Sequence, residues 1–156
     1  SGRGPRLMDL RELYQDVILD HNRNPQNFGK PDDSNRQADG HNPLCGDKIT
    51  VYITVEGDRV EDLHFDGVGC AISTASASLM TESLKGRSLG EVAELFEVFH
   101  ELVMGNADAM FDGPDLGKLI AFQGVSEYPM RVKCATLCWH TLNAAIQSKQ
   151  DTVTTE

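Results

Sequence analysis

Apolar positions along the chain follow a helical spacing first and a strand-like alternation afterwards. Between residues 9 and 21 they recur every three or four positions, which predicts an amphipathic helix started by a capping box of Asp9 and Glu12. Apolar and polar residues alternate over residues 48–55, and a second strand pattern covers residues 60–65. Because the polar turn between them contains Gly57, the two segments predict an antiparallel hairpin.

Helical spacing returns after the hairpin and predicts further helices. The first starts at Cys70 and runs to Leu84, and Ser88 with Glu91 forms a capping box for the next helix, which ends at Gly105. A short helix is expected over residues 116–122, and a long one over residues 130–147. Residues 22–42 are expected to be a long polar loop, with residues 37–42 as the source of a third strand, and residues 106–114 an acidic loop.

This order of elements predicts an α+β fold in which a small antiparallel β-sheet is packed on one face by several α-helices. A chain of 156 residues is most simply one domain, which we place at residues 9–148. Residues 1–8 are expected to be disordered or vector-derived, and residues 149–156 to form a flexible tail.

Composition narrows the classes of function. The net charge of -10 argues against nucleic-acid binding, because such proteins need basic patches. The sequence contains no run of about 18 apolar residues and no signal-peptide core, so we expect a cytoplasmic protein without membrane contact. Four cysteines are too few for a disulfide scaffold, which makes metal binding or thiol chemistry the better interpretation.

The candidate chemistry centres on three cysteines and an aspartate. Cys45 and Asp47 stand two residues apart just before the first strand, whereas Cys70 and Cys134 each begin a helix. Thiolates and carboxylates are zinc ligands, and four of them make a tetrahedral site. The alternatives are that Cys138 replaces Asp47 as the fourth ligand, or that the cysteines are inert and buried. His21 and His41, at the ends of the long loop, are expected to be solvated.

Thiol chemistry at such a site is also possible. A zinc-bound thiolate stays nucleophilic near neutral pH, so one that leaves the metal could attack a sulfane sulfur and carry it as a persulfide. Cys45 is the most mobile candidate because its loop is flanked by glycine. Arg131 and Lys133 could stabilise an anionic persulfide or fix Asp47, or they could form an ordinary solvated first helical turn.

Four segments of the chain resemble the U-type iron–sulfur assembly family, which includes the IscU and NifU amino-terminal scaffolds. The resemblance covers nearly all of residues 10–146. The segments that carry it are Leu13-Tyr14-Gln15-Asp16-Val17-Ile18-Leu19-Asp20-His21, Asn42-Pro43-Leu44-Cys45-Gly46-Asp47, Gly67-Val68-Gly69-Cys70-Ala71-Ile72-Ser73 and Tyr128-Pro129-Met130-Arg131-Val132-Lys133-Cys134-Ala135.

Two features make the chain similar to the SufU branch of this family. Lys133 stands where the IscU type has a histidine, and the segment between Cys70 and Cys134 is longer. Members of the branch bind zinc and accept persulfide sulfur from SufS, a cysteine desulfurase that uses pyridoxal phosphate. The resemblance thus implies an IscU/SufE-like fold, a zinc-dependent sulfurtransferase, and sulfur delivery to a downstream iron–sulfur assembly scaffold.

The resemblance also implies roles for individual residues. Cys45, Asp47, Cys70 and Cys134 match the zinc ligands, Cys45 the sulfur acceptor, and Arg131 an arginine that assists transfer. A desulfurase histidine would take over a zinc position and free the acceptor thiol. Two alternatives remain: a scaffold that assembles a [2Fe-2S] cluster on the same cysteines, against which Lys133 counts, and a structural zinc domain that only binds partners.

Overall fold

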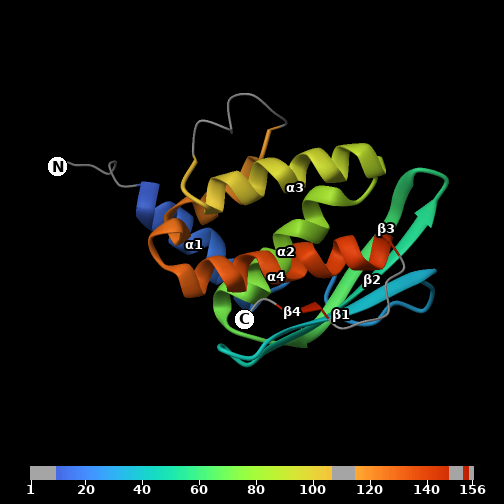
Figure 1. Cartoon of the computed structure of the whole chain (residues 1–156), viewed down its shortest axis with the longest axis horizontal. Helices are drawn as coiled ribbons and strands as arrows, with labels where there is room; N and C mark the ends of the chain where they lie inside the picture. Colours follow the sequence, from blue (N-terminus) through green and yellow to red (C-terminus); the bar gives the residue numbers. More distant parts are fainter. Residues whose placement is uncertain (1–9, 107–114, 148–152, 155–156) are drawn as a thin grey trace.

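A four-stranded sheet forms one layer of the computed structural model, which describes residues 10–106, 115–147 and 153–154 (Figure 1). Its strands are β1 (Arg36–Asn42), β2 (Asp47–Glu56), β3 (Arg59–Val68) and β4 (Val153–Thr154), in the order β3-β2-β1-β4. The β1–β2 and β2–β3 pairs are antiparallel, and β4 pairs with β1 in parallel. The sequence pattern correctly predicted the β2–β3 hairpin and the location of the third strand.

The helices form the second layer, on one face of the sheet, as Figure 1 shows. Their bounds are α1 (Leu10–Arg23), α2 (Ala71–Leu84), α3 (Leu89–Val103), the 3₁₀ helix η2 (Gly117–Glu127) and α4 (Pro129–Ile146). None of the described helices is both long enough and apolar enough to cross a membrane. A layer of helices on one face of a small sheet is the α+β fold that the order of elements predicted.

One helix start lies where its local signal predicted it, and one helix differs from the expectation. Ser88 accepts a hydrogen bond from the Glu91 amide while the Glu91 carboxylate accepts one from the Ser88 amide, which is the predicted capping box. The helix expected over residues 116–122 is instead the longer 3₁₀ helix η2. Asp9 and residues 107–114 lie outside the described residues.

Two segments differ from the sequence-based expectation. Val153 and Thr154, inside the expected flexible tail, form β4 because Val153 is half-buried against the core and pairs with the edge of β1. His21 was expected to be solvated, which is wrong: it is only 6% exposed, and its Nδ1 lies 2.7 Å from the Ser78 hydroxyl on α2. The last turn of α1 packs on α2, so burial lowers the pKa of this imidazole.

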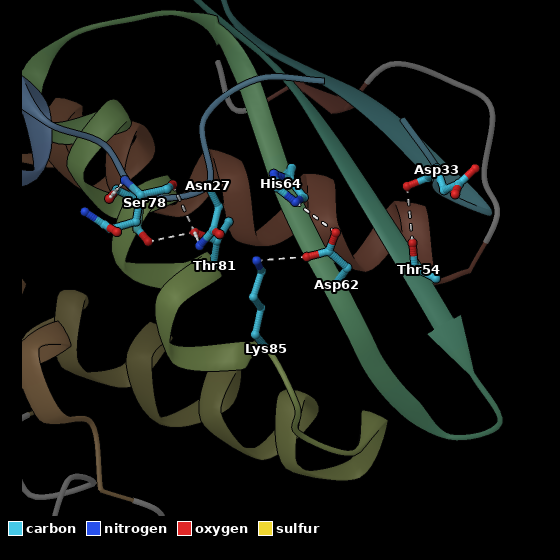
Figure 2. A network of polar contacts seen from close by, with 9 residues as sticks. Asn27, Asp33, Thr54, Asp62, His64, Ser78, Thr81 and Lys85 are labelled. Carbon is cyan, nitrogen blue, oxygen red and sulfur yellow. Dashed lines mark hydrogen bonds and ion pairs between the residues drawn. The ribbon is translucent and has the colours of Figure 1, made fainter. Parts of the chain in front are cut away.

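Polar contacts join the loop before β1, the helix α2 and the edge strand β3 (Figure 2). Thr81 on α2 accepts a hydrogen bond from the Asn27 amide. The Asp62 carboxylate on β3 contacts both His64 and Lys85, and its pKa is lowered: these partners and the Leu63 amide outweigh burial, the largest single influence, which acts in the opposite direction. The contacts fix the sheet edge relative to α2, whose opposite end holds the candidate site.

The packing of α4 on β1 brings the two halves of that site together. A Cβ atom on Gly40 would collide with the Thr141 hydroxyl of α4 and would also press on Leu137 and Ile49. Glycine at this position of β1 therefore allows a close approach of strand and helix. Trp139 of α4 is fully buried and stacks on Phe99 of α3, with ring centroids 4.7 Å apart.

Candidate metal centre

The first candidate ligands lie on the turn that joins β1 to β2. Asn42 and Asp47 are paired across the hairpin, and residues 43–46 form its tip. Gly46 has φ +72°, a conformation that favours glycine, and a Cβ at this position would point into open space. Cys45 is half-buried on this tip, whereas Asp47, the first residue of β2, is fully buried.

Cys70 provides the next sulfur from the start of α2. It is the N-cap residue, and its Sγ accepts a hydrogen bond from the Ser73 amide at 3.4 Å. Its own amide donates to Oδ1 of Asp47 at 2.8 Å, and its Sγ lies 3.9 Å from Oδ2 of the same carboxylate. The backbone at Gly69 passes so close to Asp47 that a Cβ there would lie 3.0 Å from Oδ1.

The last sulfur comes from the second turn of α4. Cys134 is 2% exposed, and its Sγ lies 3.1 Å from the Sγ of Cys45. The Asn42 side-chain amide donates to the same sulfur at 3.7 Å. In Figure 1 the β1–β2 turn and the starts of α2 and α4 are found at the same end of the molecule.

These side chains form a cluster that can bind a metal ion. Donor atoms of Cys45, Asp47 and Cys134 all lie within 4.8 Å of one another. Two sulfurs bound to one zinc ion at about 2.3 Å are about 3.8 Å apart, so the cluster needs only small adjustments to close around zinc. Cys70 contacts Asp47 beside this cluster but is not one of the three residues whose donor atoms converge, so its role as the fourth ligand remains a prediction.

Without a metal ion, the pKa values of Cys70 and Cys134 are shifted in opposite directions. Hydrogen bonding to Cys134, assisted by the amides of Ser73 and Ile72 and opposed by burial, lowers the pKa of Cys70 to about 7. The same hydrogen bond, together with burial, raises the pKa of Cys134. These opposite shifts make Cys70 the thiol that ionises more readily in the metal-free site, and a bound cation would favour the loss of the remaining protons.

The two basic residues predicted beside the site point to different surroundings. The guanidinium of Arg131 is 4.3 Å from the centre of the Tyr128 ring, and both residues line a cavity of about 830 Å³ next to the first turn of α2. Among the ion pairs of the described residues, none joins Arg131 to Asp47. Lys133 is half-buried and lines a separate cavity beside β4. Their predicted roles in sulfur transfer remain predictions.

Cys138 belongs to the core. Its sulfur is fully buried 3.5 Å from the Ser76 hydroxyl, and burial raises its pKa to about 12. Within the described part of the chain it is outside the cluster of donor atoms. The alternative in which Cys138 replaces Asp47 as a ligand is therefore not supported.

Asn42 is the residue at this site that sequence reasoning missed. It is fully buried at the end of β1 and contacts both the cysteine-bearing turn and Cys134. The only signal was its position before Pro43 and Cys45, and there a polar residue is also typical of an ordinary turn.

Comparisons with known proteins agree with this geometry. The family model described as the NifU-like N-terminal domain matches residues 13–148. The chain is 42% identical over 142 residues to the zinc-dependent sulfurtransferase SufU of Bacillus subtilis, covering 91% of this chain and 95% of the relative. It is 38% identical over 141 residues to the iron–sulfur cluster assembly scaffold protein IscU of Streptococcus pyogenes, covering 90% and 87% of the two chains.

A solved structure shares the fold. It is a candidate iron–sulfur cluster assembly scaffold protein for the SUF system of Fervidobacterium islandicum, with 34% sequence identity and a TM-score of 0.76. The superposition covers 87% of this chain and 98% of the other.

Proposed function

Since the chain belongs to the family of the NifU-like N-terminal domain and is thus a U-type protein of iron–sulfur cluster assembly, we propose that it is a zinc-dependent sulfurtransferase. It accepts persulfide sulfur from a SufS-type cysteine desulfurase and passes it to a downstream assembly scaffold. The observation that carries this proposal is the convergence of Cys45, Asp47 and Cys134 donor atoms within 4.8 Å, beside Cys70. A cytoplasmic setting suits four free thiols.

Each ligand has a distinct part in this function. When bound, zinc would keep the thiolates deprotonated near neutral pH and so keep them nucleophilic. Asp47 and Cys134 are buried and anchored on β2 and α4, so they hold their positions. Cys45 lies half-buried on the exposed turn, which makes it the sulfur that can reach a partner.

Sulfur transfer from the desulfurase persulfide to Cys45 is an exchange reaction that needs no further oxidant or reductant. The Cys45 thiolate attacks the outer sulfur of a persulfide on the desulfurase, and a new S–S bond forms at Cys45. The bond between that outer sulfur and the donor cysteine breaks, and the donor leaves as a thiolate. We expect Arg131 to assist by attracting the anionic donor, since its guanidinium is exposed on Tyr128.

The test measures sulfide release by a SufS-type desulfurase with cysteine and a thiol reductant, in the presence of the zinc-loaded chain. The wild type should stimulate release, and Cys45→Ser should abolish stimulation while retaining the helix and sheet content of the wild type. Cys138→Ala removes a core thiol outside the cluster and should stimulate like the wild type. Full stimulation by Cys45→Ser would overturn the proposal.

A second function, assembly of a [2Fe-2S] cluster on the same cysteines, is favoured by the similarity to an IscU scaffold. Anaerobic reconstitution with iron and sulfide separates the two. A stable cluster chromophore in the wild type, together with no stimulation of a desulfurase, would support the scaffold instead. Zinc binding without stimulation and without a cluster would leave a structural zinc domain.

A further inference from the structure

Asn42 makes three contacts inside the site although no solvent reaches it. Its carbonyl oxygen accepts the Cys45 amide at 3.2 Å, and its side-chain Oδ1 accepts the Leu44 amide at 3.2 Å. Its Nδ2 donates to the Cys134 sulfur at 3.7 Å, a normal length for a bond to the large sulfur atom. Because a backbone N–H can only donate, the side-chain oxygen must face Leu44, and this turns Nδ2 toward Cys134.

Little else restrains the tip of the β1–β2 turn. Pro43, Leu44 and Gly46 are exposed, and nothing lies within 4 Å of the position a Cβ of Gly46 would take. The backbone amides of Leu44 and Cys45 both donate to oxygens of Asn42. The Cys45 amide bonds the main chain of residue 42, whereas the Leu44 amide bonds its side chain, so the asparagine side chain links the Cys45 turn to the Cys134 sulfur.

We propose that Asn42 is a positioning residue that controls how readily Cys45 separates from the other ligands. Its oxygens accept the Leu44 and Cys45 amides and so order the turn, and its side-chain N–H donates to the Cys134 sulfur on α4. This inference rests on the proposed function in one respect: the separation of Cys45 matters because Cys45 is both a metal ligand and the acceptor thiol. Partners that orient metal ligands typically change metal affinity by about 10–100-fold when they are removed.

Two substitutions separate the two side-chain contacts of Asn42, the one made by its oxygen and the one made by its N–H group. Asn42→Ala removes both the acceptor for Leu44 and the donor to Cys134. Asn42→Asp has the same shape and keeps an oxygen for the Leu44 amide, but it places a second acceptor, with negative charge, against the Cys134 sulfur. The first should release the Cys45 turn, whereas the second should weaken the hold on Cys134.

The experiment measures alkylation of each cysteine by iodoacetamide in the full zinc-loaded chain, using peptide mass spectrometry, and zinc affinity by competition with a chelator. Asn42→Ala should raise the Cys45 rate by at least about tenfold, more than the Cys134 rate, and weaken zinc binding by about 10–100-fold. Asn42→Asp should raise the Cys134 rate more than the Cys45 rate. Ser78→Ala, which removes a fully buried hydroxyl of α2 that bonds His21 and the Gln26 amide and touches no residue of the cluster through these bonds, is the control for loss of stability alone.

The ratio of the two alkylation rates decides the outcome. A ratio that stays at the wild-type value in both variants, or changes equally in Ser78→Ala, would overturn the proposal and leave Asn42 a residue of the fold only. If Asn42→Ala does not fold, the isosteric Asn42→Asp carries the test alone. Neither readout involves a desulfurase, so a failure of sulfur transfer to Cys45 would leave these results unchanged.

Discussion

Asp47→Asn is the substitution for which the structure gives opposite predictions with and without metal. Asp47 is fully buried, its Oδ1 accepts the Cys70 amide at 2.8 Å, and Asn keeps both this acceptor and the side-chain shape. The metal-free variant should therefore stay within about 1 kcal/mol of the wild-type free energy of unfolding. The substitution removes an anionic ligand, so zinc should bind at least about 100-fold more weakly.

The size of the effect follows from ligand linkage. At a zinc concentration 1,000 times the wild-type dissociation constant, binding stabilises the wild type by about 4.1 kcal/mol. For a variant that binds about 100-fold more weakly, the same concentration gives about 1.4 kcal/mol. The difference of about 2.7 kcal/mol corresponds to a loss of roughly 5–11 °C in the zinc-induced increase of Tm for a domain of this size.

The assay is thermal unfolding of both proteins with a chelator and in a zinc buffer. Asp39→Asn is the matched control, because Asp39 is an exposed carboxylate on β1 that accepts a hydrogen bond from Thr50. The control should keep the full zinc-induced shift. A folded Asp47→Asn protein with the wild-type shift would refute the assignment of Asp47 as a ligand, and collapse of the metal-free variant would show that the carboxylate serves the fold.

Three further predictions follow from contacts and pKa shifts. Gly40→Ala should lower the free energy of unfolding by about 1–3 kcal/mol in urea titrations, because its methyl group meets Thr141, whereas Gly124→Ala, with open space around it, should stay close to wild type. Burial lowers the pKa of His21, so as the pH falls the unfolded chain takes up the His21 proton before the folded chain does, and the free energy of unfolding should decrease below about pH 6.5. The decrease should be smaller in His21→Gln, and an equal decrease in both proteins would contradict the argument. The pKa of Cys70 is lowered to about 7, so the metal-free wild type should gain stability relative to Cys70→Ser as pH rises from about 7 to about 9, and a gain that begins only above pH 9 would disagree.

Sequence patterns predicted the elements that local chemistry determines. The alternation of residues 48–65 and the Ser88–Glu91 capping box depend on neighbours in the chain, and both occur as expected. The third strand was expected at residues 37–42 because the hairpin needs a further strand, although the segment is otherwise typical of a loop, and β1 does pair with β2 there. Strand β4 could not be predicted, because a two-residue strand exists only where the folded chain presents an edge of β1 to Val153.

The convergence of Cys45, Asp47 and Cys134 could be predicted from the sequence, whereas the residues that pack around them could not. Thiols and a carboxylate indicate metal binding by their chemistry, whereas the burial of His21 depends on how α1 packs on α2. The prediction for Asn42 was missing for the same reason: an amide before a proline is usual in turns, and only the folded chain directs it at a sulfur 92 positions away. Cys138 has the right chemistry and the wrong surroundings, which the spacing of cysteines does not reveal.

The central claim is that Cys45 receives sulfur while the other donors hold the metal. The most direct measurement is peptide mass spectrometry after the zinc-loaded chain has reacted with a SufS-type desulfurase and cysteine, with free thiols and persulfides trapped by alkylation. The account predicts one added sulfur atom on the peptide that contains Cys45, absent without the desulfurase. An added sulfur on Cys70 or Cys134 instead, or an unmodified Cys45 beside an active desulfurase, would contradict it.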